Sequence, residues 1–116
     1  MELVALLSSG KGTWAQVAGL INRENWDKII LVGSEFAEKF TVNQAHEFVK
    51  FDTDASIIEM KQELMKKLNG LIDGTEVALS IASGDGREHM ALISALLSLP
   101  VGVRFTALTK DGVIYF

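Results

Sequence analysis

Two short segments of the chain combine glycine with hydroxyl-bearing and basic side chains. The first reads Ser8-Ser9-Gly10-Lys11-Gly12-Thr13, and the second reads Ser83-Gly84-Asp85-Gly86-Arg87. In a glycine loop that leads into a helix, unpaired backbone amides and the positive end of the helix dipole can bind a phosphate. The serine and threonine hydroxyls add donors, and Lys11 and Arg87 add positive charge. The two segments therefore predict a site for a phosphate-containing ligand.

A purely structural role is the alternative for both loops, because glycine and serine also turn a chain at the ends of strands. Asp85 argues against a phosphate at the second loop unless its carboxylate caps the following helix. Glu88, three residues later, completes a capping-box pattern that allows this. We therefore expect the Asp85 carboxylate to point away from the ligand.

The first loop does not match a P-loop, because it lacks the early glycine that lets backbone amides wrap a triphosphate. It does match the looser dinucleotide pattern G-x-G-x-x-A at Gly10, Gly12 and Ala15, and Glu35 follows about 20 residues later. However, 116 residues leave no segment for the substrate domain of an NAD enzyme. Nucleotide or dinucleotide sensing without catalysis therefore stays as an alternative.

Alternating apolar runs and helical patterns surround these loops. Short apolar runs predict strands at 3–7, 28–32, 48–51, 77–82, 103–108 and 113–116. Helical spacing predicts four helices. The first follows Thr13, which forms a capping-box pattern with Gln16, and the second spans 35–40. The third runs from Asp54 to Leu68 with Ile58 on its apolar face, and the fourth follows Asp85. Asn69-Gly70 closes the third of these helices, and Asp111-Gly112 predicts a hairpin between the last two strands.

This order of elements predicts one doubly wound, Rossmann-like α/β domain that spans residues 1–116. Right-handed crossovers favour a mostly parallel six-stranded sheet in the order 3-2-1-4-5-6, with an antiparallel hairpin at one edge. The first and fourth strands are then neighbours whose outgoing connections diverge to opposite faces. We therefore expect the two glycine loops to form the walls of one crevice.

The loop after the first strand and the stretch from Leu79 to Leu92 resemble the CRISPR-associated Rossmann fold (CARF) domains. That stretch reads Leu-Ser-Ile-Ala-Ser-Gly-Asp-Gly-Arg-Glu-His-Met-Ala-Leu, whereas the family commonly has a Gly-Gly-Thr-Lys loop before a Met-Ala helix. Asp85 stands where the family often has glycine, Arg87 stands for lysine, and one extra residue precedes Met90. The resemblance covers essentially the whole chain and includes the final strand pair.

The resemblance implies a homodimer whose two crevices join into one pocket for a cyclic oligoadenylate, the second messenger of type III CRISPR antiviral defence. Some members are ring nucleases, which open this ligand without metal or cofactor to give 2′,3′-cyclic phosphate products. The expected ligand-binding residues are Ser8, Gly10, Gly12, Thr13, Ser83, Gly84 and Gly86, and the expected catalytic residues are Ser9, Lys11 and Arg87. A structural dimerisation domain is a further alternative.

Composition restricts the partners. The chain is 48% hydrophobic, carries a net charge of −4 and has no cysteine. Its acidic balance argues against double-stranded DNA as a ligand, and its apolar content favours self-association. The apolar N-terminal run lacks a basic region and is too short to span a bilayer, so we expect a cytoplasmic protein without a membrane partner.

Two further residues lie close to the predicted loops. His89 is the obvious candidate for a general base, and Trp14 is a packing residue or a base-stacking one.

Overall fold

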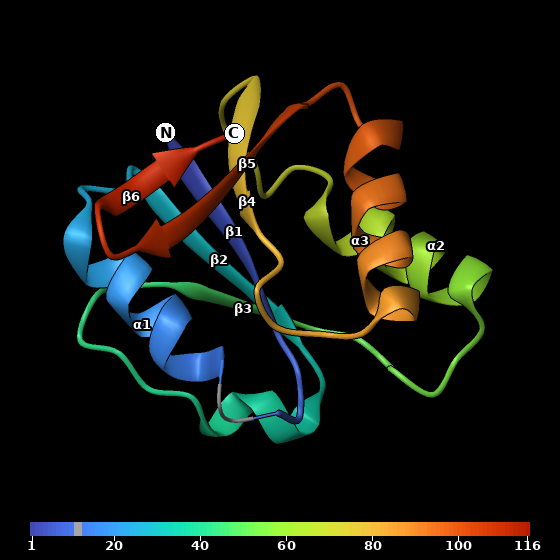
Figure 1. Ribbon diagram of the computed structural model, residues 1–116. Coiled ribbons are helices and arrows are strands. Elements are labelled where there is room, and N and C mark those ends of the chain that lie inside the picture. Colours follow the sequence, from blue (N-terminus) through green and yellow to red (C-terminus); the bar gives the residue numbers. More distant parts are fainter. Residues whose placement is uncertain (11–12) are drawn as a thin grey trace.

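The computed structural model describes residues 1–10 and 13–116 and confirms the predicted sheet (Figure 1). The strand order is β3-β2-β1-β4-β5-β6, parallel except for the antiparallel β5–β6 pair. The strands are β1 (Glu2–Leu7), β2 (Lys28–Gly33), β3 (Glu47–Lys50), β4 (Glu76–Ser80), β5 (Gly102–Thr109) and β6 (Gly112–Tyr115). The helices are α1 (Trp14–Arg23), the 3₁₀ helix η2 (Glu35–Lys39), α2 (Ile57–Leu68) and α3 (Gly86–Ser98).

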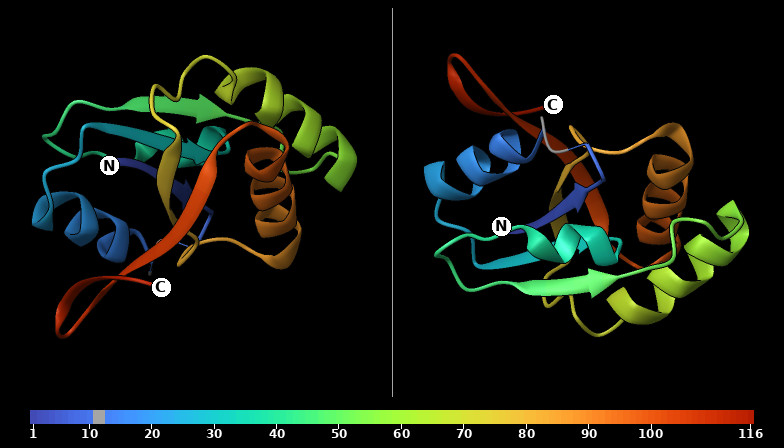
Figure 2. Two further views of the ribbon diagram at one scale, coloured as in Figure 1. Left: turned by 90° about the horizontal axis from the view of Figure 1, so that it is seen from above. Right: turned by 90° about the horizontal axis from the view of Figure 1, so that it is seen from below.

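Helices cover both faces of the sheet, and this explains why β1 is a continuous apolar run. Leu3, Ala5 and Leu7 pack on one face against α1 and η2. Val4 and Leu6 pack on the other face against α2 and α3, which lie side by side in Figure 2. Because every residue of β1 is buried, alternating polar positions would be costly in this strand. Within β1 only the first residue, Glu2, is therefore polar, and the next polar residue, Ser8, follows the strand.

The start of α1 differs from the prediction, because Thr13 and Gln16 do not form a capping box. Thr13 is the N-cap residue, but its hydroxyl donates to the Gly10 carbonyl oxygen at 3.1 Å. The Gln16 side-chain amide instead donates to the Leu108 carbonyl oxygen of β5 at 2.9 Å. The Gln16 side chain thus makes a tertiary contact with β5 instead of the predicted capping bond at the start of α1.

The predicted start of α2 at Asp54 is also wrong. The Asp54 amide donates to the Asp52 side chain at 2.9 Å, which makes a turn before the helix. Ser56 is the cap, and its hydroxyl accepts from the Glu59 amide at 3.2 Å. Ile58 is 69% exposed and lies off the buried face of the helix. The helix therefore begins at Ile57, three residues later than predicted, and its apolar face is narrower than predicted.

Other local predictions agree with the structure. Gly70 follows α2 with φ +85°, and Gly112 has φ +103° at the β5–β6 turn, so both glycines adopt the left-handed conformation that their positions require. The helix expected at 35–40 is the short 3₁₀ helix η2. In the described part of the chain, no helix is both long enough and apolar enough to cross a bilayer.

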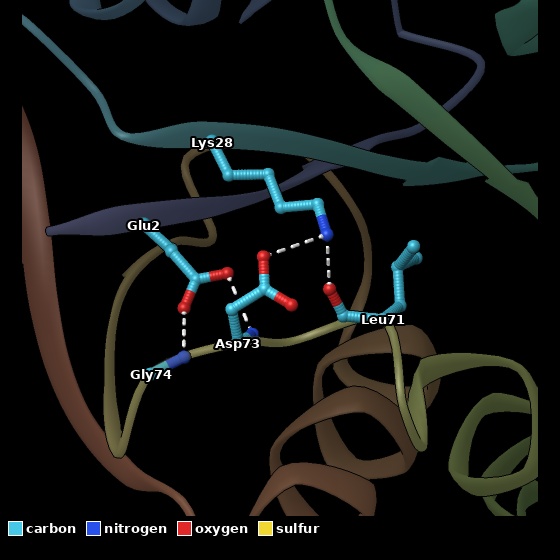
Figure 3. A network of polar contacts seen from close by, with 5 residues as sticks. All are labelled: Glu2, Lys28, Leu71, Asp73 and Gly74. Carbon is cyan, nitrogen blue, oxygen red and sulfur yellow. Dashed lines mark hydrogen bonds and ion pairs between the residues drawn. The ribbon is translucent and has the colours of Figure 1, made fainter.

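A polar network fastens the connection between α2 and β4 to the amino ends of β1 and β2 (Figure 3). The buried Glu2 carboxylate accepts hydrogen bonds from the backbone amides of Asp73 and Gly74. Beside it, the Lys28 ammonium donates to the Leu71 carbonyl oxygen and pairs with the Asp73 carboxylate at 3.2 Å. The network lies at the end of the sheet opposite to the glycine loops.

We expect Glu2→Gln to lower the free energy of unfolding by about 1–3 kcal/mol. The glutamine NH₂ group would face a backbone N–H donor in a buried position, so one donor would lose its acceptor. Glu47→Gln, at an exposed position of β3, is the matched control and is expected to have little effect. Urea unfolding measures both, and equal stability of the two variants would contradict the role of the network.

Candidate functional site

The two glycine loops face each other across a hollow at the carboxyl ends of β1 and β4. These strands are parallel neighbours, and their connections lead to α1 and α3 on opposite faces of the sheet. The hollow has a volume of about 410 Å³ and is lined by Ser8, Ser9, Gly10, Thr13, Ala82, Ser83, Gly84 and Asp85. We call this hollow the crevice. It lies at the topological switch point, where doubly wound sheets commonly bind their ligands.

Hydrogen bonds through Ser8 hold the two loops together. The Ser8 amide donates to the Ser83 hydroxyl oxygen at 2.8 Å, and the Ser8 hydroxyl donates to Oε1 of Glu88 at 3.1 Å. The same carboxylate oxygen accepts from the Asp85 amide at 2.8 Å. Glu88 is 4% exposed, so its carboxylate lies beneath the loops rather than in solvent.

Sequence reasoning assigned Glu88 only to the capping box of α3. That part is confirmed, because the Asp85 carboxylate accepts from the Glu88 amide at 2.8 Å while Glu88 accepts from the Asp85 amide. The bond from Ser8 to Glu88 spans 80 positions of sequence, and no local pattern indicates it. Glu88 is therefore the residue near the crevice whose second role the sequence analysis missed.

Trp14 supports the first loop from the other side. Its indole N–H donates to the Ser8 carbonyl oxygen at 2.8 Å. The ring also packs against Phe36 and Phe40, with centroid distances of 5.7 and 5.8 Å. These contacts give Trp14 a packing role in the core between α1, η2 and the sheet.

The crevice offers backbone donors. None of the described residues accepts a hydrogen bond from the exposed amides of Ser9 and Gly84, whereas the buried Ser83 hydroxyl holds the Ser8 amide. Gly84 has φ +107°, which a residue with a side chain rarely adopts. The adjacent α3 adds the positive end of its dipole, and the Asp85 carboxylate, which caps this helix at the rim of the crevice, offsets part of it.

The other predicted residues lie in different places. The Arg87 guanidinium donates to the Thr53 and Ala55 carbonyl oxygens in the connection between β3 and α2, and Arg87 does not line the crevice. His89 Nε2 lies 2.8 Å from the Ser83 carbonyl oxygen. Gly86 is the first residue of α3, next to the rim. The predicted site residues Lys11 and Gly12 lie outside the described residues.

A second hollow, of about 380 Å³, lies at the carboxyl ends of β2 and β3, and Glu35 is among the residues that line it. On its wall, Glu63 accepts from the Asp52 amide at 3.0 Å and pairs with Lys67 at 3.0 Å. The bond from the Asp52 amide lowers the pKa of Glu63. Partial desolvation raises this pKa, and Lys67 lowers it.

Within residues 1–10 and 13–116, no three His, Asp or Glu side chains form a group that could hold a metal ion.

No protein-family model matches the chain, and no curated protein sequence is significantly similar to it. The function is therefore inferred from the crevice itself and from the residues that surround it.

We expect Gly84→Ala to destabilise the protein by about 1–3 kcal/mol and to distort the second loop. A Cβ at this position would lie 2.5 Å from a Leu6 methyl carbon, and the positive φ adds backbone strain. Gly86→Ala is the control, because a Cβ there meets nothing within 4 Å and alanine suits a helix. Thermal unfolding compares the two variants, and unchanged stability of Gly84→Ala would show that the loop does not need this conformation.

Proposed function

We propose that the crevice binds a nucleotide through its phosphate. The observation that carries this proposal is the hollow between two helix-leading glycine loops, in which the exposed Ser9 and Gly84 amides have no acceptor among the described residues. Such donors fit the oxygens of a phosphate, and their place at the switch point is the usual ligand position of this fold. Lys11, by its place in the sequence of the first loop, supplies positive charge.

The proposed ligand is a cyclic oligoadenylate bound by a homodimer, as the resemblance to CARF domains implies. Ala82 lines the crevice and also an adjacent apolar hollow with Ile81, Phe105 and Phe116. Phe116 is 75% exposed, so a second copy that covered this surface would bury apolar area beside the crevice. A twofold axis near this surface would bring two crevices together around a symmetric ligand.

Ring opening is the proposed reaction for such a ligand. The ligand's own 2′-hydroxyl oxygen bonds to the adjacent phosphorus, the bond from phosphorus to the 5′ oxygen breaks, and the hydroxyl proton ends on that leaving oxygen. The product end is a 2′,3′-cyclic phosphate. The protein contributes in-line alignment and charge stabilisation, for which Ser9 and Lys11 are the proposed residues. Arg87 would contribute only after leaving the Thr53 and Ala55 carbonyls.

The second candidate is a sensing module for AMP or NAD without catalysis. The observation that favours it is the hollow beside Glu35 at the ends of β2 and β3. In dinucleotide-binding folds, an acidic residue in this region accepts hydrogen bonds from a ribose of the nucleotide. This candidate predicts that Glu35→Ala weakens AMP or NAD binding, whereas Glu47→Ala, at an exposed position of β3, does not.

Calorimetric titration with cyclic tetra-adenylate and cyclic hexa-adenylate tests the first proposal, with AMP and NAD in parallel. We expect one cyclic ligand to bind with a Kd in or below the micromolar range, and Lys11→Ala to weaken this binding about tenfold through the loss of a charge near phosphate. Lys110→Ala, in the exposed β5–β6 turn, is the matched control. Chromatography of the bound ligand then shows whether a 2′,3′-cyclic phosphate forms.

If neither cyclic ligand gives a binding heat at high micromolar concentration, the proposed ligand is ruled out. Binding of AMP or NAD alone would favour the sensing module. If no nucleotide binds and charge reversal at Lys11 has no effect, the structural dimerisation domain remains.

We expect Asp85→Asn to tighten binding of an anionic nucleotide by about threefold to tenfold at low salt. Asparagine caps a helix about as well as aspartate, so the fold is kept while a negative charge leaves the rim of the crevice. Asp111→Asn, in the exposed hairpin turn, has the same change of charge and serves as the control. Titration at two salt concentrations measures the effect, which is expected to shrink as salt increases. An unchanged Kd would mean that the bound anion lies far from Asp85.

A further inference from the structure

The protons of Ser8 are all used within the protein, although the residue lines the crevice. Its amide donates to the Ser83 hydroxyl oxygen at 2.8 Å, and its hydroxyl donates to Glu88 Oε1 at 3.1 Å. Its carbonyl oxygen already accepts from the Trp14 indole at 2.8 Å. A serine hydroxyl has one proton and two lone pairs, so the Ser8 hydroxyl can offer a ligand only its remaining lone-pair capacity.

Glu88 fixes this direction of donation. A carboxylate only accepts hydrogen bonds, and Glu88 is only 4% exposed, so its Oε1 depends on the Ser8 hydroxyl and the Asp85 amide as partners. If Ser8 turned its proton toward the crevice, a buried charged oxygen would lose one of these two donors, which is unfavourable. The Ser8 hydroxyl oxygen therefore offers only a lone pair to a group that reaches it from the crevice.

The neighbouring groups have the opposite polarity. The exposed Ser9 and Gly84 amides can only donate, and neither has an acceptor among the described residues. A phosphate oxygen has no proton to give, so it fits these donors and not Ser8. The part of the ligand that meets Ser8 must carry a proton. In a cyclic oligoadenylate, the proton-bearing group nearest to each phosphate is the 2′-hydroxyl of the ribose.

We infer that Ser8, positioned by Glu88, accepts a hydrogen bond from a ribose 2′-hydroxyl and makes the crevice selective for a cyclic oligoadenylate over its 2′-deoxy counterpart. This inference rests on the proposed nucleotide binding. The ligand hydroxyl donates to Ser8, and Ser8 donates to Glu88, so the two bonds run in the same direction and polarise each other. In a 3′–5′-linked cyclic oligoadenylate the 2′-hydroxyl is the free hydroxyl of each ribose. Ser8 is thus a specificity-determining residue and Glu88 a positioning residue.

The test compares ligands on the unaltered protein first. Cyclic tetra-adenylate and cyclic hexa-adenylate are titrated against their all-2′-deoxy counterparts, and we expect the ribose form of the ligand that binds to do so about tenfold more tightly. Ser8→Ala is expected to reduce the ratio of the two Kd values to about one, chiefly by weakening the ribose form. Equal Kd values for the ribose and deoxy forms on the unaltered protein would overturn the inference and leave nucleotide binding intact. No binding of any form would instead overturn the proposed function.

Two conservative variants test whether the preference for ribose depends on the hydrogen bonds of Ser8 or only on the packing around it. Ser8→Thr keeps the hydroxyl, and Glu88→Gln keeps an amide oxygen that can accept from both Ser8 and the Asp85 amide. Both are expected to keep most of the preference for ribose, whereas Ser8→Ala loses it. A thermal scan of each variant checks the fold. If a folded Ser8→Ala variant keeps the full preference for the ribose form, another group binds the ribose hydroxyl and the inference is wrong.

Discussion

The burial of β1 on both faces is the constraint from which the rest of the arrangement follows. A strand covered by α1 and η2 on one side and by α2 and α3 on the other has no position for a polar side chain along its length. Its polar residues therefore come at the ends, where Glu2 binds the connection that precedes β4 and Ser8 binds the loop that follows β4. Both ends of β1 are thus tied to the same neighbouring strand.

The crevice and the start of α3 form one polar unit rather than a site added to a finished scaffold. Glu88 closes the capping box with Asp85 and also receives the Ser8 hydroxyl, so one buried carboxylate serves a helix end and a loop from another part of the chain. Arg87, one residue earlier, extends in another direction and holds the connection between β3 and α2. The first turn of α3 therefore positions three separate segments around the carboxyl edge of the sheet.

The sequence predicted features that depend on local pattern or on general rules of connection. Apolar runs and right-handed crossovers gave the strand order, and the Asp85–Glu88 pair gave the cap of α3, because both partners lie within one turn. The same reasoning was wrong at α1, where Gln16 bonds to Leu108 of β5, and at α2, where the Asp52–Asp54 turn delays the helix. The crevice followed from topology, but its donor and acceptor pattern did not. That pattern depends on the Ser8–Glu88 bond, which forms only once the chain has folded.

The length of β1 also has a consequence for how substitutions combine. Ser8 lies six positions after Glu2 along an extended strand, a span of about 20 Å. Sites so far apart that share no partner usually contribute additively to free energy. The amino end of the sheet can therefore accumulate changes that raise or lower stability while the hydrogen bonds around the crevice stay as they are. The stability of this small domain and the shape of its crevice can thus change independently of each other.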